Sequence, residues 1–139
     1  RWPRPIVLVG CVAAFGGLSA SFGVWGESLM SALGPPPRDV SEVMRLAVSV
    51  LSVGAVLDVI LAALWEEVLF RGVLMPRVGL AASSAAFAAL HGLQYGAFDL
   101  WIGLALGLAF GVIAARWGTV AAALGHVSWN LVAAYTAAG

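Results

Sequence analysis

Long apolar runs separated by short polar segments constrain this chain more than any other feature. The first run, residues 6–25, contains no charged side chain, and about 20 apolar residues are enough for a helix to cross a bilayer. Hydrophobic residues make up 62% of the 139 residues and charged residues only 10%, whereas a soluble domain has about 45–50% apolar and about 25% charged residues. The sequence therefore predicts an all-α fold, a polytopic transmembrane helix bundle.

The apolar runs predict about five spans. They cover residues 6–25, about 43 to 76, about 80 to 93, about 98 to 115 and about 119 to 137. The segment 27–42 holds three acids and three consecutive prolines, and is predicted to be a loop. Pro76 is predicted to end the second span, because proline interrupts the hydrogen bonds of a helix.

The arginines predict an orientation. If the spans alternate in direction, one side of the membrane holds four arginines and the other holds two: Arg1, Arg4, Arg77 and Arg116 against Arg38 and Arg45. The side richer in arginine faces the cytoplasm, so we expect a multi-pass protein of the cell membrane with a cytoplasmic N-terminus. The lipid bilayer is then one partner. Nucleic acid is not an expected partner, because the net charge is zero and no basic run is present.

A cluster of three ionisable residues lies near the end of the apolar second span, where such groups are costly unless they are paired or hydrated. Glu67 and Arg71 are four residues apart, so they can pair on one helix face. Glu66 is about 140° from Arg71 around a helix that turns 100° per residue. Glu66 must therefore pair with a residue on another helix, be hydrated, or be protonated. Asp58, about two turns before Glu66, is a second acid that we expect to be buried.

The two histidines are the candidate partners of Glu66. His91 lies in the third span and His126 in the fifth, with Asn130 four residues later on the same face as His126. At about 1.5 Å per residue, counted from the cytoplasmic ends of the spans, the depths are about 14 Å for Glu66, about 17 Å for His91 and about 12 Å for His126. The three groups are therefore predicted to lie in one layer.

Simpler interpretations exist for each feature. The Glu67–Arg71 pair is expected to be structural, and a single membrane histidine more often forms a hydrogen bond between helices. Glycines 103, 107 and 111 share one face of the fourth span and would let a neighbouring helix approach closely. A non-catalytic binding or immunity protein, or a proton-coupled transporter, could use the same polar layer. The combination of an acid, two histidines and an asparagine at one depth favours catalysis.

Three short motifs occur in order on separate spans: EEVLFR at 66–71, FAALH at 87–91 and HVSWN at 126–130. Together they resemble the EExxxR, FxxxH and HxxxN/D motifs of the CAAX prenyl protease and bacteriocin-processing family of intramembrane proteases. The resemblance covers about residues 55–134, and members of that family usually carry further N-terminal spans. On this basis residues 1–139 are one transmembrane domain with a catalytic-like core at 55–134. Residues 1–42 hold the first span and a loop without a recognised motif.

The resemblance implies an intramembrane endopeptidase that acts on a membrane-associated peptide or a C-terminal segment. It implies that Glu66 is the catalytic glutamate and that His91 helps it to activate water. His126 and Asn130 would stabilise the oxyanion, and the pair formed by residues 67 and 71 would support the catalytic helix.

Such an enzyme could use zinc or work without a metal. Glu66, His91 and His126 could together be a zinc ligand set, since zinc sites are built from histidine and carboxylate ligands. A metal-free, glutamate-type protease is favoured, because no other close carboxylate would remain to act as the base if Glu66 bound a metal.

Overall fold

The computed structural model describes residues 3–33 and 53–138, and these residues form helices without any β-strand. The elements are α1 (Pro5–Leu33), α3 (Val53–Glu67), the π-helix η1 (Val68–Leu74), α4 (Met75–Tyr95), α5 (Ala97–Trp117) and α6 (Thr119–Ala138). The prediction of an all-α helical bundle is confirmed.

Three helical stretches are long and apolar enough to cross a membrane. They are Pro5–Phe22, Gly54–Tyr95 and Ala97–Trp117. The second stretch combines α3, η1 and α4 and changes direction once, so it holds both the second and the third predicted spans. The fifth predicted span corresponds to α6, which is not among the three stretches. About five spans is therefore slightly more than these helices show.

The change of direction within Gly54–Tyr95 occurs at Gly79 and not at Pro76. Gly79 has φ 84° and ψ 169°, a backbone conformation open essentially only to glycine. Pro76 lies in the first turn of α4, where proline is tolerated in a helix. The prediction that Pro76 ends the second span is thus wrong, because η1 runs on into α4. The predicted start of that span, near residue 43, lies outside the described residues.

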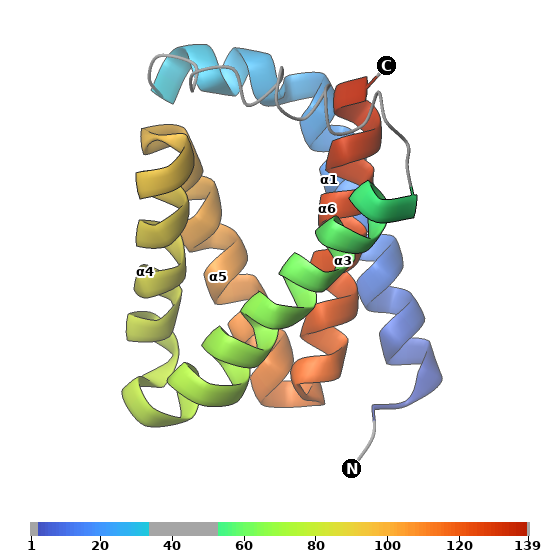
Figure 1. The fold of residues 1–139 in the computed structure, drawn as a ribbon, viewed down its shortest axis with the longest axis vertical. Coiled ribbons are helices and arrows are strands. Elements are labelled where there is room, and N and C mark those ends of the chain that lie inside the picture. The colour runs from blue at the N-terminus through green and yellow to red at the C-terminus, as the bar shows by residue number, and fades with distance from the viewer. Residues whose placement is uncertain (1–2, 34–52, 139) are drawn as a thin grey trace.

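Helix α1 is longer than the first predicted span. It runs from Pro5 to Leu33, so residues 27–33 are helical and the loop prediction is wrong for them. Residues 34–42 of that predicted loop lie outside the described residues. Figure 1 shows that the C-terminal part of α1 bends away from the rest of the helix and runs across one end of the bundle.

Helices α1 and α6 run side by side in the same direction. The Ser19 hydroxyl donates a hydrogen bond to the Trp129 carbonyl at 2.9 Å, and the Ser128 hydroxyl donates one to the Val12 carbonyl at 2.8 Å. Helices α3, α4, α5 and α6 alternate in direction, so the N- and C-termini lie at opposite ends of the bundle (Figure 1).

Helices α4 and α5 approach closely through the glycines of α5. A Cβ atom added at Gly103 would lie 3.2 Å from the Cα of Ala88, and one added at Gly107 would lie 3.2 Å from the Cα of Ser84. These distances are shorter than ordinary Cβ contacts. The prediction that these glycines allow a neighbouring helix to approach is confirmed.

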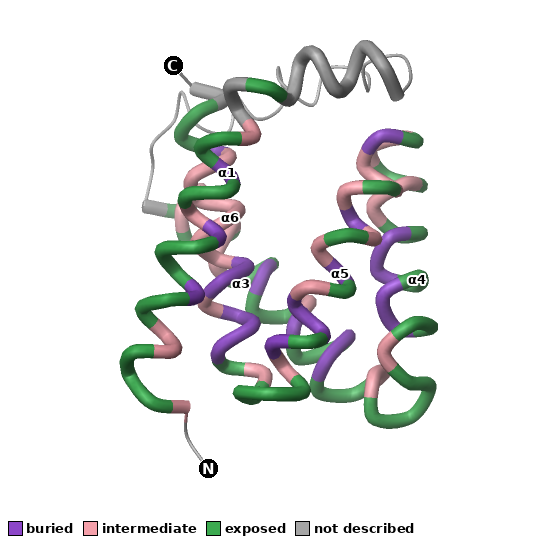
Figure 2. The backbone as a smooth tube through the Cα atoms, turned by 180° about the vertical axis from the view of Figure 1, so that it is seen from behind, coloured by how far each residue is buried: buried purple, intermediate pink, exposed green. Residues whose placement is uncertain are grey.

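The apolar core lies where α1, α5 and α6 meet. Its buried members are Cys11, Phe15, Phe110, Ile113, Ala121 and Ala122. Figure 2 shows that buried segments alternate with exposed ones along these helices. Many large apolar side chains lie on the outside, among them Trp65 and Leu93, as expected for helices that face lipid.

Candidate active site

The two glutamates of the first motif stand at the junction of α3 and the π-helix η1. The N–H of Met75 bonds to the Phe70 carbonyl, five residues earlier, which is the hydrogen-bond pattern of a π-helix. The Ser83 hydroxyl donates to the same carbonyl at 2.7 Å. Segments of π-helix are frequent at functional sites. Here the hydrogen bond from Ser83 joins η1 to the part of α4 that follows the change of direction at Gly79.

Glu67 and Arg71 form the predicted ion pair. Nη1 of Arg71 lies 2.9 Å from Oε1 of Glu67, and both side chains are almost fully buried. Nη2 of Arg71 donates a hydrogen bond to the Gly107 carbonyl at 3.2 Å. The guanidinium carbon lies 4.5 Å from the ring centroid of Phe87, a cation–π geometry. The pair thus joins α3 and η1 to the glycine face of α5.

His126 is a third member of this buried group. Its Nδ1 lies 3.0 Å from Oε1 of Glu67, and only 3% of its side chain is exposed. Its ring stacks on that of Phe110, with centroids 4.7 Å apart and an interplanar angle of 21°. Sequence reasoning missed the contact between Glu67 and His126, because helical spacing gives neighbours within one helix only.

Glu66 lies on the more open side of the same junction. Its Oε2 is 3.7 Å from Nε2 of His126 and 3.9 Å from Nε2 of His91, and a quarter of its side chain is exposed. These separations are too long for direct hydrogen bonds and suit groups that share a bridging water. Within the described residues, Oε2 accepts no hydrogen bond. Glu66 is therefore the free acid that the sequence predicted, and both histidines face it.

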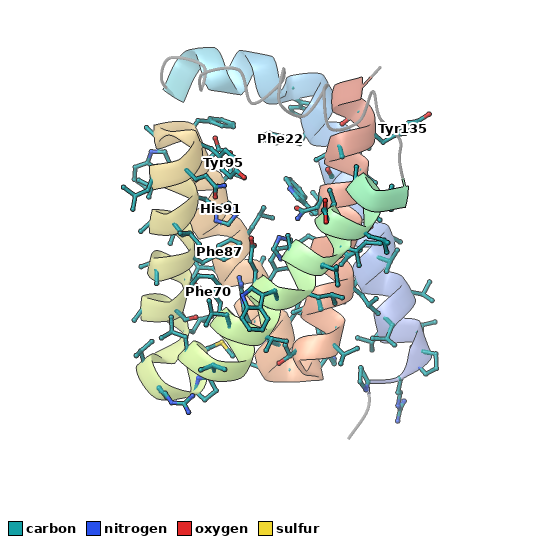
Figure 3. All side chains as sticks on the ribbon, viewed as in Figure 1. Phe22, Phe70, Phe87, His91, Tyr95 and Tyr135 are labelled. Atoms are coloured by element: carbon teal, nitrogen blue, oxygen red, sulfur yellow. The ribbon has the colours of Figure 1, made fainter. Side chains whose placement is uncertain are left out.

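His91 is held by its own helix and by the aromatic residue of its motif. Its Nδ1 lies 3.0 Å from the Phe87 carbonyl, and its ring centroid lies 4.3 Å from that of Phe87. In Figure 3, His91 and Tyr95 point from α4 toward the inside of the bundle. Phe87 of the FxxxH motif therefore holds the ring of His91 through both its carbonyl and its own ring.

The remaining polar residues lie apart from this contact network. Asn130 follows His126 by one turn of α6 and is partly exposed, and its side chain forms no hydrogen bond with another described residue. Its role stays a prediction from its spacing. Asp58 is exposed, so the expectation that it would be buried is wrong.

The arrangement of Glu66, His91 and His126 bears on whether they could bind zinc. Ligands of a tetrahedral zinc lie about 2.0–2.2 Å from the ion when they are histidine or carboxylate. Among residues 3–33 and 53–138, no group of three histidine, cysteine, aspartate or glutamate side chains is arranged to hold a metal ion. A zinc ion at this place would therefore require Glu66, His91 and His126 to move closer together than they stand in the structure.

A family model described as type II CAAX prenyl endopeptidase Rce1-like matches residues 48–132. The match includes all three motifs, together with α3, η1, α4, α5 and the first part of α6. The chain belongs to this family. The resemblance of its motifs to CAAX prenyl proteases is thereby confirmed. As a member of a CAAX prenyl endopeptidase family with several membrane-length helices, the chain is a membrane protein of a protease family whose substrate is a peptide or protein. No curated protein and no solved structure matches it.

Proposed function

We propose that this protein is an intramembrane endopeptidase that hydrolyses a membrane-associated peptide or the C-terminal segment of a protein. One observation carries the proposal. The Nε2 atoms of His91 and His126 converge on the same oxygen of Glu66, at 3.9 Å and 3.7 Å. This oxygen is buried and has no hydrogen-bond partner among the described residues, so it is available to a water held between the acid and the two imidazoles.

Peptide hydrolysis needs an activated water, a stabilised oxyanion and a protonated leaving amine. Glu66 is the general base that takes a proton from the attacking water. His91 holds the same water through Nε2, because its Nδ1 side is occupied by the Phe87 carbonyl. The proton taken by Glu66 then passes to the amine as the C–N bond breaks. This sequence returns Glu66 to its ionised form.

His126 and Asn130 stabilise the oxyanion in this proposal. They project from one face of α6, one turn apart. Hydrogen-bond donors in such a position typically contribute about 3–4 kcal/mol to the transition state. The Glu67–Arg71 pair holds the end of α3, so that Glu66 keeps its place opposite the two histidines.

We favour a metal-free mechanism because of the carboxylates available. Glu67 is engaged by both Arg71 and His126. If Glu66 served as a metal ligand, no free carboxylate would remain beside it to act as the base. Zinc, held by Glu66, His91 and His126, is the alternative that a chelator tests. The proposal also places the protein in the cell membrane with its N-terminus in the cytoplasm.

The test is a cleavage assay on the detergent-solubilised protein with a library of quenched fluorogenic peptides. Wild type is compared with Glu66→Gln, each with and without a chelator. Asp58→Asn is the matched control, because Asp58 is an exposed acid on the same helix as Glu66. We expect Glu66→Gln to lower kcat by about 10²–10⁴-fold, the usual contribution of a general base. The control should retain the wild-type rate.

The chelator arm separates the two mechanisms. Activity that is lost in Glu66→Gln but survives the chelator in wild type supports the glutamate-type protease. Activity that is lost in both arms indicates a metal enzyme with Glu66 as ligand or base. Equal rates for wild type and Glu66→Gln would contradict a catalytic role for this residue. Absence of cleavage by wild type across the library would favour a non-catalytic membrane protein that uses the same polar layer.

A further inference from the structure

We propose that Glu67 is a positioning residue for His126 as well as the partner of Arg71. It fixes His126 in the tautomer that carries a proton on Nδ1, and it thereby aims the Nε2 atom at Glu66. The inference deepens the proposed function and rests on it for its mechanistic meaning, although the arrangement itself is independent of substrate.

The direction of the hydrogen bond follows from the chemistry of Glu67. An ionised carboxylate accepts hydrogen bonds and has none to donate. Glu67 is ionised because Oε1 pairs at 2.9 Å with the guanidinium of Arg71, which stays charged in proteins. Nδ1 of His126 lies 3.0 Å from the same oxygen. His126 must therefore donate through an Nδ1–H group.

Two aromatic rings hold the imidazole of His126 in this orientation. Phe110 stacks on it at 4.7 Å, and Phe87 meets it edge-on, with centroids 5.8 Å apart and an interplanar angle of 75°. These contacts hold the plane of the imidazole, and the hydrogen bond to Glu67 selects which of the two flipped orientations the ring adopts in that plane. With Nδ1 on Glu67, the opposite edge of the ring places Nε2 at 3.7 Å from Oε2 of Glu66.

His91 provides a comparison within the same site. Its Nδ1 faces the Phe87 carbonyl at 3.0 Å, and a carbonyl oxygen also only accepts. Both histidines thus share one tautomer and present Nε2 to Glu66. The acceptor of His91 belongs to the backbone, whereas that of His126 is a side chain that substitution can remove. His91 is therefore an internal reference for any change at His126.

The tautomer determines what His126 does during the reaction. In the neutral ring, Nε2 carries a lone pair and accepts. It becomes an N–H donor to the oxyanion while it shares the proton that Glu66, 3.7 Å away, takes from water, and that same proton goes on to the leaving amine as the C–N bond breaks. The charged groups facing His126 are Glu66 and Glu67 from α3 and Arg71 from η1, with His91 on the far side of Glu66. The carboxylate of Glu67 stabilises the imidazolium, as an aspartate does for the histidine of a serine protease.

The test uses the small number of histidines in the chain. The sequence contains two, so 15N-histidine labelling gives NMR signals from His91 and His126 alone, and a His91→Gln variant assigns them. The informative variant is the double substitution Glu67→Leu with Arg71→Leu. It removes the acceptor and also the guanidinium that would otherwise stay buried and unpaired, and apolar replacement of a whole buried pair is tolerated. Glu66→Gln is the control, because it alters only the Nε2 side.

In wild type we expect Nδ1 to be protonated in both histidines. In the double variant, His126 should change to the tautomer protonated on Nε2, while His91 is unchanged. Glu66→Gln should leave Nδ1 of His126 protonated. An unprotonated Nδ1 of His126 in wild type, or an unchanged His126 in the double variant, would overturn the proposal.

A milder variant covers the case in which the double variant does not fold. Glu67→Asp keeps the charge but withdraws the carboxylate by one methylene, so the Nδ1 signal of His126 should shift toward that of the unprotonated nitrogen. No shift would overturn the proposal. None of these spectra needs a substrate, so they remain decisive if the protein cleaves no peptide. A spectrum that contradicts the proposed tautomer does not decide the role of Glu66, which the cleavage assay tests separately.

Discussion

A single oxygen of Glu67 contacts two basic side chains, and this contact explains how a charged group is kept inside an apolar bundle. Oε1 lies 2.9 Å from Arg71 and 3.0 Å from His126. A buried charge is tolerated only when partners and hydrogen bonds replace its hydration. Half of this arrangement was predictable, because a spacing of four residues indicates the pair with Arg71. The other half was not, since nothing in the sequence reports which helix His126 faces.

Because Glu67 is buried and paired with Arg71, removal of Arg71 is predicted to lower the stability of the protein. We expect Arg71→Met to lower the free energy of unfolding in detergent by about 3–5 kcal/mol, the usual result of breaking a buried pair. The substitution leaves Glu67 without its cation and removes the side-chain donor to the Gly107 carbonyl. The measurement is chemical denaturation followed by circular dichroism. Arg77→Met is the matched control, because Arg77 is exposed, and a similar loss in both variants would contradict the argument.

At the scale of the helices, the pairing of α4 with α5 positions two components of the site. The glycine face of α5 brings the Gly107 carbonyl to Arg71 and lets α4 present His91. The glycine spacing was enough to predict close packing, because three small residues at intervals of four share one face. The turn was misplaced at Pro76, because proline is tolerated in a first helical turn and the positive φ of Gly79 has no signature of its own.

The close approach predicts that Gly107→Ala is destabilising. Its Cβ would lie 3.2 Å from the Cα, the Cβ and the carbonyl oxygen of Ser84, so α4 and α5 must separate. We expect a loss of about 1–3 kcal/mol in the free energy of unfolding, as for other overpacked cores. Gly10→Ala is the control, since its Cβ meets nothing within 4 Å. Equal stability of the two variants would show that the glycine face does not set the helix spacing.

For the whole molecule, the alternation of the helices assigns each turn to one end of the bundle. The N-terminus, the start of α4 and the end of α5 lie at one end of the bundle (Figure 1). Arg4 precedes α1, Arg77 lies in the first turn of α4 and Arg116 in the last turn of α5. This agrees with the grouping that the sequence predicted for them. The extent of α1 was not predictable, because hydropathy marks the part of a helix that lies in lipid and not the polar turns that continue beyond it.

This arrangement predicts which turns are accessible from each side of the membrane. In a Cys11→Ala background, a cysteine at Gln94 should react with a membrane-impermeant maleimide added to intact cells, and a cysteine at Arg116 should react only after lysis. Both positions are exposed and lie next to turns at opposite ends of α5. The reverse pattern would invert the proposed orientation, and labelling of both from outside would contradict the alternation.

The division of the site between an early and a late part of the chain has a consequence for biosynthesis. Glu66 and His91 belong to one continuous hairpin, α3 to α4, whereas His126 belongs to α6. A ribosome completes the hairpin before it has made α6, so the partly inserted chain holds an acid and one histidine but not the second. In the proposed mechanism the acid and both histidines come together only when α6 enters beside α1, so the capacity for cleavage would arise late in biosynthesis.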